Sequence, residues 1–497
     1  MAGLGLNHIL EIAKRGLFAQ RLGIDITGHN VANATRPGYS RQRADLRSGE
    51  VLKSSQGLLG TGVLSTNGGR LRNAFIDEQV RNSYGSFEDA STQRSVLSRI
   101  ETKINELTTN GIGQQLTRFF NSFQTLSQQP EDLQPRINVV NQAKRLTDTF
   151  HTTFQAYQSA QKETIDQLGI VLNQVNELGK AISQLDVEVL RLQSSGSDAS
   201  DTKDQRDILI DELSKLANVK VSEDSRGSVI VSLGGTVIAS RAGSLTLSTA
   251  FVTKETTFEG SDVAVPQLVI VGPPFNEDSA EDPRLRLVNV TSGQLNGYLN
   301  VYNNLLTPGL IRLNTMANVL TEKVNEIHEN GAGRYNPETG SAESGLSFFN
   351  PDVINTDDLV LGNSASLIAI ADEIYQDPNN VAGTEDEGLP GNNVIAKQLA
   401  ALLDERMFLT VDEPTLTISE YNNLTTDEIA TASFQAANLQ EASESVLQQM
   451  QFQQQAVSGV STDEEMANLI NFQRAYDASA KVASTVNDMF LTILNMV

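Results

Sequence analysis

Four histidines are the side chains of this chain best suited to proton transfer or metal ligation: His8, His29, His151 and His328. They are scattered over 497 residues and form no motif, although a fold can bring distant residues together. Cysteine is absent, which excludes thiolate metal sites, thiol nucleophiles and disulfides. We therefore predict a protein without a catalytic residue, a metal site or a cofactor.

Three carboxylates in the segment SDTKDQRD could in principle ligate Ca²⁺: Asp201, Asp204 and Asp207. The segment lacks the central Gly and the closing Glu of a calcium-binding loop, so the charged start of a helix is the favoured interpretation. The glycines of GLLGTGVLSTNGG (57–69) lack GxGxxG spacing, and hairpin or loop positions explain them better. The motifs GxxxxGK[ST], HExxH and GxSxG are also absent.

A basic group of side chains near the N-terminus could bind nucleic acid: Arg36, Arg41, Arg43 and Arg47. Residues 1–75 carry ten Lys/Arg against four Asp/Glu, but the whole chain has a net charge of −24. This charge disfavours duplex nucleic acid as a partner. We therefore predict that these arginines lie on a solvated or subunit-facing surface.

Residues 331–430 are strongly acidic, with eighteen Asp/Glu against three Lys/Arg. So many unpaired carboxylates cannot be buried cheaply, and we expect them to face solvent.

Long amphipathic helices are predicted at both ends of the chain, because apolar residues recur there in steps of three and four. The first helix covers about 28 residues, and the last lies within 460–497, which contain no Gly or Pro. The two stripes consist of Leu6, Leu10, Ala13, Leu17, Gln20, Ile24, Thr27 and Val31, and of Leu469, Phe472, Tyr476, Ala480, Ala483, Val486, Phe490, Ile493 and Val497.

Three interior segments show the same helical spacing: 150–192, 292–329 and 429–457. Each could be an ordinary helix packed in a core, but the six unbroken heptads of 150–192 favour a long helical bundle. The segment 292–329 is interrupted by Pro308-Gly309. The glutamine run QQMQFQQQ (448–455) falls within the last stripe, and we interpret it as helix surface rather than as a prion-like tract.

Residues 219–290 differ from these helices, since short β-branched runs alternate with Gly, Ser and Asp and predict a small all-β domain. Residues 330–393 are rich in Gly, Asn, Pro and Asp and predict irregular surface structure. No apolar run is long enough for a transmembrane helix, and the N-terminal residues lack the pattern of a signal peptide. We expect a cytosolic protein, or one that leaves the cell without a cleaved signal.

The first helix meets a hard stop in NVANATRPGYSR (30–41). Proline disfavours helical geometry at Arg36, and Gly38 tolerates a positive φ, so the helix should end near Thr35 and the chain should turn. The amides of Asn30 and Asn33 lie on one helix face, where they could bond free carbonyls or a neighbouring chain.

The two ends of the chain resemble the flagellar rod, hook and hook-associated protein family. The N-terminal resemblance lies in GLFAQRLGIDITGHNVANATRPGYSRQR, at Leu22, Asn30, Ala32, Asn33, Pro37, Gly38 and Tyr39. The C-terminal segment VSGVSTDEEMANLINFQRAYDASAKVASTVNDMFLTILN is similar to the partner motif. Together they cover roughly 90 residues, and both are most similar to the hook-associated members.

The resemblance implies a mainly α fold with a β insert. The terminal helices would form a coiled coil that lines the inner tube of the flagellar axis, and the inserts would face outward. The implied domains are a coiled coil (1–40 and 456–497), a helical bundle (41–215, 291–335 and 394–455), a β-rich outer domain (216–290) and an acidic irregular outer insert (336–393).

The resemblance also implies a structural subunit at the hook–filament junction, exported by the flagellar type III system and located in the extracellular flagellum. Its partners would be further copies in the axis, the hook protein, a second hook–filament junction protein and a cytosolic chaperone at the C-terminal helix. Neither nucleic acid nor membrane insertion is expected. The predicted assembly residues are Leu22, Asn30, Asn33, Pro37, Gly38, Tyr39, Leu469, Phe472, Tyr476, Phe490 and Ile493.

Two alternatives stay open from the sequence. The first is a hook or distal rod protein of the same family. The second is a surface enzyme or adhesin on a flagellar scaffold, which would need a site in 219–290 or 330–393.

Overall fold

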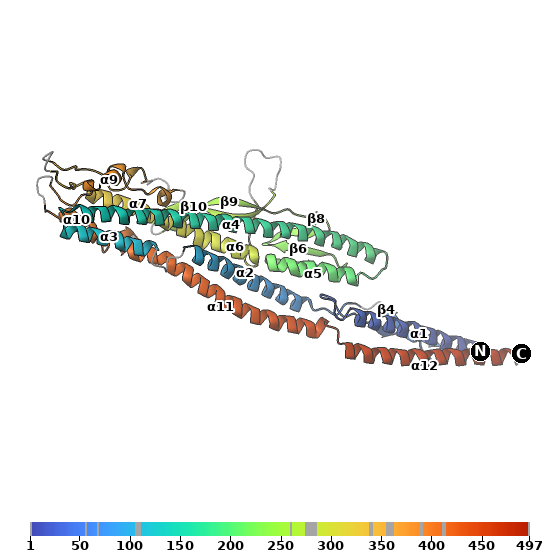
Figure 1. Cartoon of the computed structure of the whole chain (residues 1–497). Helices are drawn as coiled ribbons and strands as arrows, with labels where there is room; N and C mark the ends of the chain where they lie inside the picture. The colour runs from blue at the N-terminus through green and yellow to red at the C-terminus, as the bar shows by residue number, and fades with distance from the viewer. Residues whose placement is uncertain are drawn as a thin grey trace, which may run out of the picture. The chain divides into compact units, whose positions relative to one another are not determined.

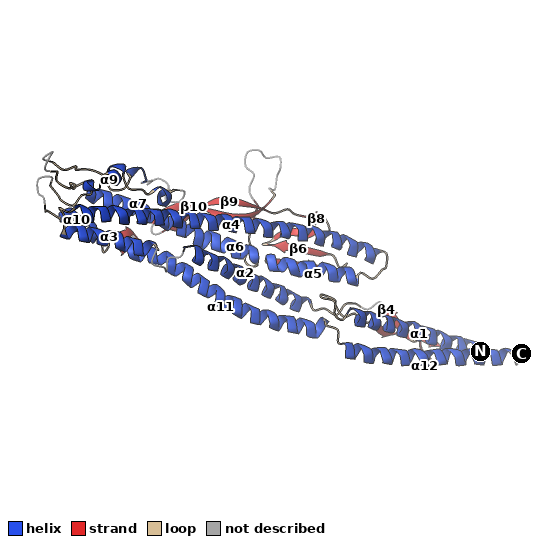
Figure 2. Ribbon diagram, viewed as in Figure 1, coloured by secondary structure: helices blue, strands red, loops and turns tan. Residues whose placement is uncertain are grey.

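The computed structural model describes residues 2–54, 57–66, 69–104, 111–258, 261–273, 286–336, 341–353, 362–386, 391–409 and 414–495. Most of these residues are helical, and the rest include five small antiparallel sheets (Figure 2). They divide into two compact units. Unit 1 comprises Met1–Phe87, Val175–Thr246 and Ser443–Val497, and unit 2 comprises Glu88–Gln174 and Leu247–Ala442. The prediction of a mainly α fold with β elements is confirmed.

Unit 1 contains the two terminal helices, α1 (Ala2–Asn33) and α12 (Thr462–Leu494). They lie side by side and run antiparallel (Figure 1). A Cβ atom at Gly23 would lie 2.7 Å from the Phe472 ring, and one at Gly16 would lie 3.0 Å from Ser479 Oγ. Each step of seven residues in α1 is thus matched by a step of seven in α12. The two predicted helices are confirmed, and small residues of α1 make room for their close approach.

The remaining helices of unit 1 are α5 (Ser200–Leu216) and parts of three helices that also contribute to unit 2: α2 (Ala74–Ile104), α4 (Leu133–Ser194) and α11 (Ile418–Ser458). The stripe predicted for 150–192 lies within α4, and the charged helix start predicted at 200–207 is the first half of α5.

Three sheets belong to unit 1. Two are hairpin-like pairs, β1 (Asp45–Ser48) with β4 (Val63–Thr66) and β2 (Val51–Ser54) with β3 (Gly57–Gly60). The third has the order β5-β6-β7-β8, with bounds Val219–Glu223, Val229–Leu233, Thr236–Ser240 and Gly243–Ser244. Alternate residues of β6 are buried, as expected for a sheet with one face on a core.

Unit 2 holds a large hydrophobic core in which α3 (Ile112–Gln128), α4, α7 (Thr307–His328) and α10 (Val394–Ala401) meet. Its two sheets are β11-β10-β9 (Arg286–Val288, Ser261–Gly272, Ser248–Phe258) and β12-β13 (Arg406–Leu409, Pro414–Thr417). The strands expected in 219–290 therefore exist, but they form two sheets that belong to different units.

The helical segment predicted at 292–329 consists of α6 (Gln294–Val301), a π-helical turn (Tyr302–Leu306) and α7. The irregular turn lies before Pro308, which occupies the first turn of α7. Proline has no N–H to donate to the preceding turn, and the helical hydrogen bonding is irregular at that turn.

The prediction of surface structure for 330–393 is wrong for its apolar residues. Besides α8 (Ser364–Leu367), α9 (Asp372–Gln376) and 3₁₀ turns at Pro351–Val353 and Pro378–Asn380, the segment supplies residues to the core of unit 2. Phe348 and Phe349 are buried there and their rings pack on Phe119. Twelve described carboxylates of 331–430 are exposed, as predicted, so the segment has an acidic outside and an apolar inside.

His328 ties this segment to α7. It is buried, and its Nδ1 lies 2.6 Å from the carbonyl oxygen of Leu346, while Ala382 N donates to its Nε2 at 2.8 Å. The imidazole therefore donates through Nδ1 and accepts through Nε2, which is a neutral form. Burial lowers the pKa of His328 to about 4.

The apolar stripe predicted for 429–457 is buried only in part. Ile429 and Ala436 join the core of unit 2, but Val446 and Val457 are exposed in unit 1. In unit 1 the side of α11 that packs inward carries Leu447, Gln451 and Gln454. The amide of Gln451 donates to Tyr84 Oη of α2 at 2.8 Å, and the amide of Gln454 donates to Asp77 Oδ1 of α2 at 2.7 Å.

Candidate functional site

The chain leaves α1 through a tight turn at 34–39. The N–H of Arg36 bonds the carbonyl of Asn33, and the N–H of Tyr39 bonds the carbonyl of Arg36, at 2.9 and 3.2 Å. Gly38 has a φ of +74°, and a Cβ there would lie 2.4 Å from Ile208 Cγ1. The predicted helix stop is confirmed two residues earlier than Thr35, and Gly38 is required both for the backbone conformation and for the close approach of α5.

Asn30 is the centre of a cluster formed with the buried Gln42 and Glu465 and the half-buried Tyr39, which we call the Asn30 cluster. Its Nδ2 donates to Gln42 O at 2.8 Å and to Glu465 Oε2 at 3.0 Å. Its Oδ1 accepts from Gln42 N at 3.0 Å and from Tyr39 Oη at 2.8 Å. Both amide protons and both lone pairs are used, and the side chain is only 1% exposed. One asparagine thus joins α1, the segment after the turn and α12.

Tyr39 extends the cluster to His29. Because the Tyr39 hydroxyl gives its single proton to Asn30, His29 Nδ1, 2.9 Å away, must be the donor in that contact. Burial raises the pKa of Tyr39, and the carboxylates of Asp201, Asp204 and Glu465 raise it further. The phenol is therefore held in its protonated, hydrogen-bonding form.

Arg41 binds the start of α12 from the other side. Its guanidinium contacts the Glu465 carboxylate at 2.7 Å and the Glu464 carboxylate at 3.2 Å. Its backbone N–H donates to Ser458 O, the last residue of α11, at 2.9 Å. Glu465 is 2% exposed, so its charge is compensated by Arg41 and by the amide of Asn30.

A network of buried ion pairs contacts the residue that follows the turn, Ser40. Ser40 donates from N and Oγ to the carboxylate of Asp204, and Arg70 bridges Asp204 and Asp207 at 2.8 Å each. Arg72 contacts Asp207 and continues to Asp77 at 2.9 Å. Burial by itself raises the pKa of Asp207, but the guanidinium groups of Arg72 and Arg70 outweigh it and hold the pKa below its ordinary value.

Two of the three aspartates considered as calcium ligands, Asp204 and Asp207, therefore serve as partners of arginines, whereas Asp201 lies 3.7 Å from His29 Nε2. Among the described residues, no group of three His, Cys, Asp or Glu side chains could hold a metal ion. None of the described helices is long and apolar enough to cross a membrane.

The predicted assembly residues occupy two regions of unit 1. Asn30 and Tyr39 belong to the Asn30 cluster, Asn33 donates to the carbonyl of His29 at 2.9 Å, and Pro37 is exposed at the turn. Leu22, Leu469, Phe472 and Phe490 are half-buried along the α1–α12 pair, whereas Tyr476 and Ile493 are exposed.

Sequence reasoning missed the charged members of the site: Arg41 as a partner of α12, Glu465, and the network of Asp204, Asp207, Arg70, Arg72 and Asp77. One signal was available for Glu465. It lies four residues before Leu469, which places a carboxylate on the apolar face of the last helix. A charge on such a face requires a buried partner.

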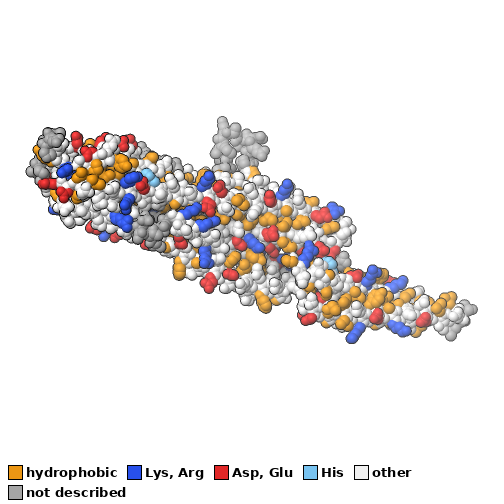
Figure 3. Space-filling view, in the orientation of Figure 1, with side chains coloured by type: hydrophobic (Ala, Val, Ile, Leu, Met, Phe, Trp, Pro, Cys, Tyr) orange, Lys and Arg blue, Asp and Glu red, His pale blue; other side chains and the backbone are white. Residues whose placement is uncertain are grey.

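The α1–α12 pair leaves apolar side chains uncovered. Val482, Met489 and Ile493 are between 41% and 50% exposed and follow one flank of α12 at helical spacing. Hydrophobic side chains are visible over the surface of α1 and α12 (Figure 3). A polar cleft of about 680 Å³ lies where the turn, α5 and the α11–α12 joint meet, and Arg36, Arg72 and Glu464 are among its lining residues.

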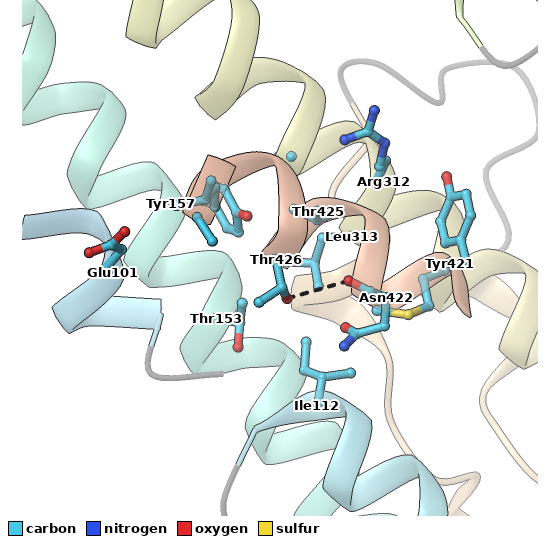
Figure 4. A pocket seen from close by; sticks show the side chains of 14 residues that line it. Glu101, Ile112, Thr153, Tyr157, Arg312, Leu313, Tyr421, Asn422, Thr425 and Thr426 are labelled. Carbon is cyan, nitrogen blue, oxygen red and sulfur yellow. Dashed lines mark hydrogen bonds between the residues drawn. The ribbon is translucent and has the colours of Figure 1, made fainter. Parts of the chain in front are cut away.

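Unit 2 contains a separate pocket of about 290 Å³, lined mainly by apolar and hydroxyl side chains (Figure 4). Tyr157 and Thr153 reach it from α4, Leu313 from α7, and Thr426 from α11, where its hydroxyl bonds Asn422 O at 3.5 Å. The described lining is suited to apolar groups and contains no histidine. The contacts that organise charge and hydrogen bonding are instead those around Asn30, which makes unit 1 the candidate site for assembly.

Comparison with known proteins also identifies flagellar proteins as the relatives of this chain. Residues 97–349 match the family model of the flagellar hook-associated protein FlgK helical domain. Residues 453–496 match the C-terminal domain of the flagellar basal body rod FlgEFG proteins.

Two relatives match along almost the whole chain. Flagellar hook-associated protein 1 of Bacillus subtilis is 27% identical over 515 residues, which cover 98% of this chain and 97% of the relative. The protein of that name from Salmonella typhimurium is 25% identical over 564 residues, covering 99% and 100%. The fold is also similar to the solved structure of the flagellar hook junction protein FlgK from Burkholderia pseudomallei, with a TM-score of 0.58 and 15% identity. The match covers 77% of this chain and 100% of the solved chain. The last likeness shows the fold.

Proposed function

The chain belongs to the FlgK family of flagellar hook-associated proteins, and from this premise we propose that it is a structural subunit that joins hook and filament at the hook–filament junction. Such a subunit binds neighbours on both sides and performs no catalysis. It would join the two by presenting fixed surfaces to the lattices of the hook and of the filament, which differ in mechanical properties.

The observation that supports this proposal best is the pairing of α1 and α12. The two helices are set in one register by Asn30 with Glu465, Gly23 with Phe472 and Gly16 with Ser479. Their uncovered apolar flank has the spacing of a helical packing surface. An antiparallel pair of this kind can contribute one wall element to an axial tube, with the flank of α12 covered by neighbouring copies.

We propose the partners in the same terms: further copies of this chain in the axis, the hook protein, and a second hook–filament junction protein. A cytosolic chaperone would cover the C-terminal helix before export, because an exposed flank such as that of α12 favours aggregation. Export would use the flagellar type III system without a cleaved signal, and the mature subunit would be part of the extracellular flagellum.

The turn after α1 gives the other predicted residues their roles. Asn33 ends α1 by bonding the carbonyl of His29, and Gly38 lets α5 approach the turn. Asn30 and Tyr39 fix the start of α12 within the chain. We propose that these four residues position the helix pair, while Phe490 and Ile493 contact neighbouring copies.

Deletion of the gene and complementation with the intact chain test the proposal. Cells without a junction subunit should build hooks but no filaments, whereas cells without a hook protein should lack hooks as well. Electron microscopy of flagella and analysis of secreted flagellin distinguish these results. Loss of hooks would favour the hook or distal rod alternative, and normal filaments would refute a junction role.

The enzyme or adhesin alternative has its own test. It requires a ligand of residues 219–290 or 330–393, and a variant of those residues that loses a binding activity while filaments stay normal would support it.

A further inference from the structure

The glutamine-rich end of α11 carries a second uncovered surface in unit 1. Val446 is 52% exposed and Phe452 is 70% exposed, and Gln449 and Gln453 lie exposed beside them. Residues 446, 449, 453 and 456 are spaced by three, four and three, so they follow one face of the helix. We call this face, formed by Val446, Gln449, Phe452, Gln453 and Ala456, the α11 face.

The α11 face is separate from the side of α11 that packs within unit 1. Leu447 is buried, and the amides of Gln451 and Gln454 are bound by Tyr84 and Asp77. The glutamines of the run therefore divide into inward members, which hold α11 on α2, and outward members, which make no contact of this kind within the described structure. Phe452 points outward and does not pack into unit 1, since its side chain is 70% exposed.

Charge is nearly absent from this part of the helix. Residues 443–458 contain one charged side chain, Glu444, although the whole chain has 20% charged residues and a net charge of −24. Two copies of so acidic a chain repel each other over most of their surfaces. A contact between copies is therefore least costly where carboxylates are missing, as on the α11 face.

Primary amides also suit this face to an uncharged surface of a second copy. Each glutamine can donate and accept at the same time, so amides of two copies can pair in either direction without a charged partner. An uncharged helix face suits such a surface better than a charged partner, which would find no opposite charge there.

We propose that the α11 face is a contact surface between copies of this chain, distinct from the flank of α12. The inference rests on the proposed self-association in the flagellar axis, and it assigns a specific function to the glutamine run. Phe452 and Val446 become buried in the contact, and Gln449 and Gln453 bond amides of the neighbouring copy.

Site-specific crosslinking tests the proposal, because the natural chain has no cysteine. The Phe452→Cys variant carries a single thiol on the α11 face, and Val482→Cys carries one on the flank of α12. Ile230→Cys, on β6 of unit 1 and 48% exposed, is an exposed control that matches Val482, which is 44% exposed. Each thiol would be labelled with a maleimide that carries a photoreactive benzophenone, assembled flagella would be irradiated, and products would be identified by mass. A photoreactive group captures whichever surface of a neighbour covers it, and copies in an open axial assembly meet through unlike surfaces.

We expect dimers of the chain from Phe452→Cys and Val482→Cys and none from Ile230→Cys. Dimers from Val482→Cys alone would overturn this inference and leave the proposed function standing. Products of Phe452→Cys that contain only a different protein would also overturn it, since another partner would then cover the face. Absence of dimers from both variants would count against self-association itself.

A second variant measures the consequence for assembly. Phe452→Glu introduces a carboxylate into the contact and should lower incorporation at least about tenfold, while Ile230→Glu should leave it unchanged. Circular dichroism and secretion must match the natural protein, because the inward side of α11 is intact. Normal incorporation of a folded, secreted Phe452→Glu variant would refute the proposal.

Discussion

Replacement of Asn30 by Asp gives the sharpest test of how the helix pair is held. The two side chains have nearly the same shape, so the change is electrostatic rather than steric. An oxygen would replace Nδ2, the atom that now donates to Glu465 Oε2 at 3.0 Å and to Gln42 O at 2.8 Å. Two stabilising hydrogen bonds would become two contacts between acceptors, one of them between carboxylates.

The magnitude follows from the burial of the site. Asn30 and Glu465 are 1% and 2% exposed, so solvent cannot screen the new pair. Loss of a hydrogen bond to a charged group costs about 1.5–3 kcal/mol, and an unsatisfied buried acceptor costs about 1–3 kcal/mol. We expect Asn30→Asp to lower the local free energy of unfolding at the start of α12 by about 3–5 kcal/mol near neutral pH.

The effect should depend on pH with a defined sign. Repulsion from Glu465 raises the pKa of the introduced carboxyl above its unfolded value, so the folded state takes up a proton that the unfolded state releases. The penalty is therefore largest at neutral pH, and its electrostatic part is lost as the pH falls below the unfolded pKa of Asp, while the hydrogen bond to Gln42 O stays missing. A protonated carboxyl can again donate to Glu465.

Native-state hydrogen exchange of the first turns of α12 measures this local stability. Asn33→Asp is the matched control, because Asn33 is half-buried and, among the described residues, its side chain donates only to the carbonyl of His29. Its effect should stay below about 1.5 kcal/mol. Equal effects of the two substitutions, or unchanged exchange in Asn30→Asp at neutral pH, would refute the role assigned to the Asn30 cluster.

Three further predictions concern other parts of the chain. His328→Gln should remove a pH dependence of the stability of unit 2. The pKa of His328 falls from 6.5 to about 4 on folding, so its contribution to the free energy of unfolding is present above pH 6.5, and about 3 kcal/mol is lost as the pH falls toward 4. Denaturant unfolding of His328→Gln, with His8→Gln as a control, would measure this loss. Gly23→Val should destabilise the helix pair by about 1–3 kcal/mol, because the new side chain overlaps the Phe472 ring; hydrogen exchange of α1 tests this, and Phe472→Ala in the same chain should restore part of the loss. Phe490→Asp should leave the unfolding of unit 2 unchanged but prevent incorporation at the hook tip, so that the secreted subunit accumulates in the medium; normal filaments from this variant would show that the residue is not in an assembly surface.

The sequence predicted the elements whose periodicity is long and regular. The stripe from Leu6 to Val31 gave α1, and the absence of Gly and Pro after residue 460 gave α12. Pro37 and Gly38 also predicted the end of α1, because their backbone restrictions are local. The four-domain division and the outward position of the inserts depend on the assembled state and stay predictions.

Long-range pairing was not predictable from the pattern. Nothing within the segment near Asn30 shows that its partner is Glu465, 435 residues away. The segment 330–393 was misjudged for a related reason, since its composition reflects its exposed carboxylates, whereas isolated pairs such as Phe348-Phe349 reach the core without any periodicity. The composition of an irregular segment therefore predicts which of its residues are exposed better than which are buried.

The end of α11 shows why an apolar stripe does not by itself identify a core. Val446 and Val457 continue the heptad spacing of Ile429 and Ala436, yet they are exposed, and the packed side of the helix there uses amides. Hydrogen bonds from Gln451 and Gln454 contribute only about 0.5–1.5 kcal/mol each in net stability, but they fix one orientation of the helix. This orientation leaves Val446 exposed, and it is the orientation that the proposed contact between copies through the α11 face requires.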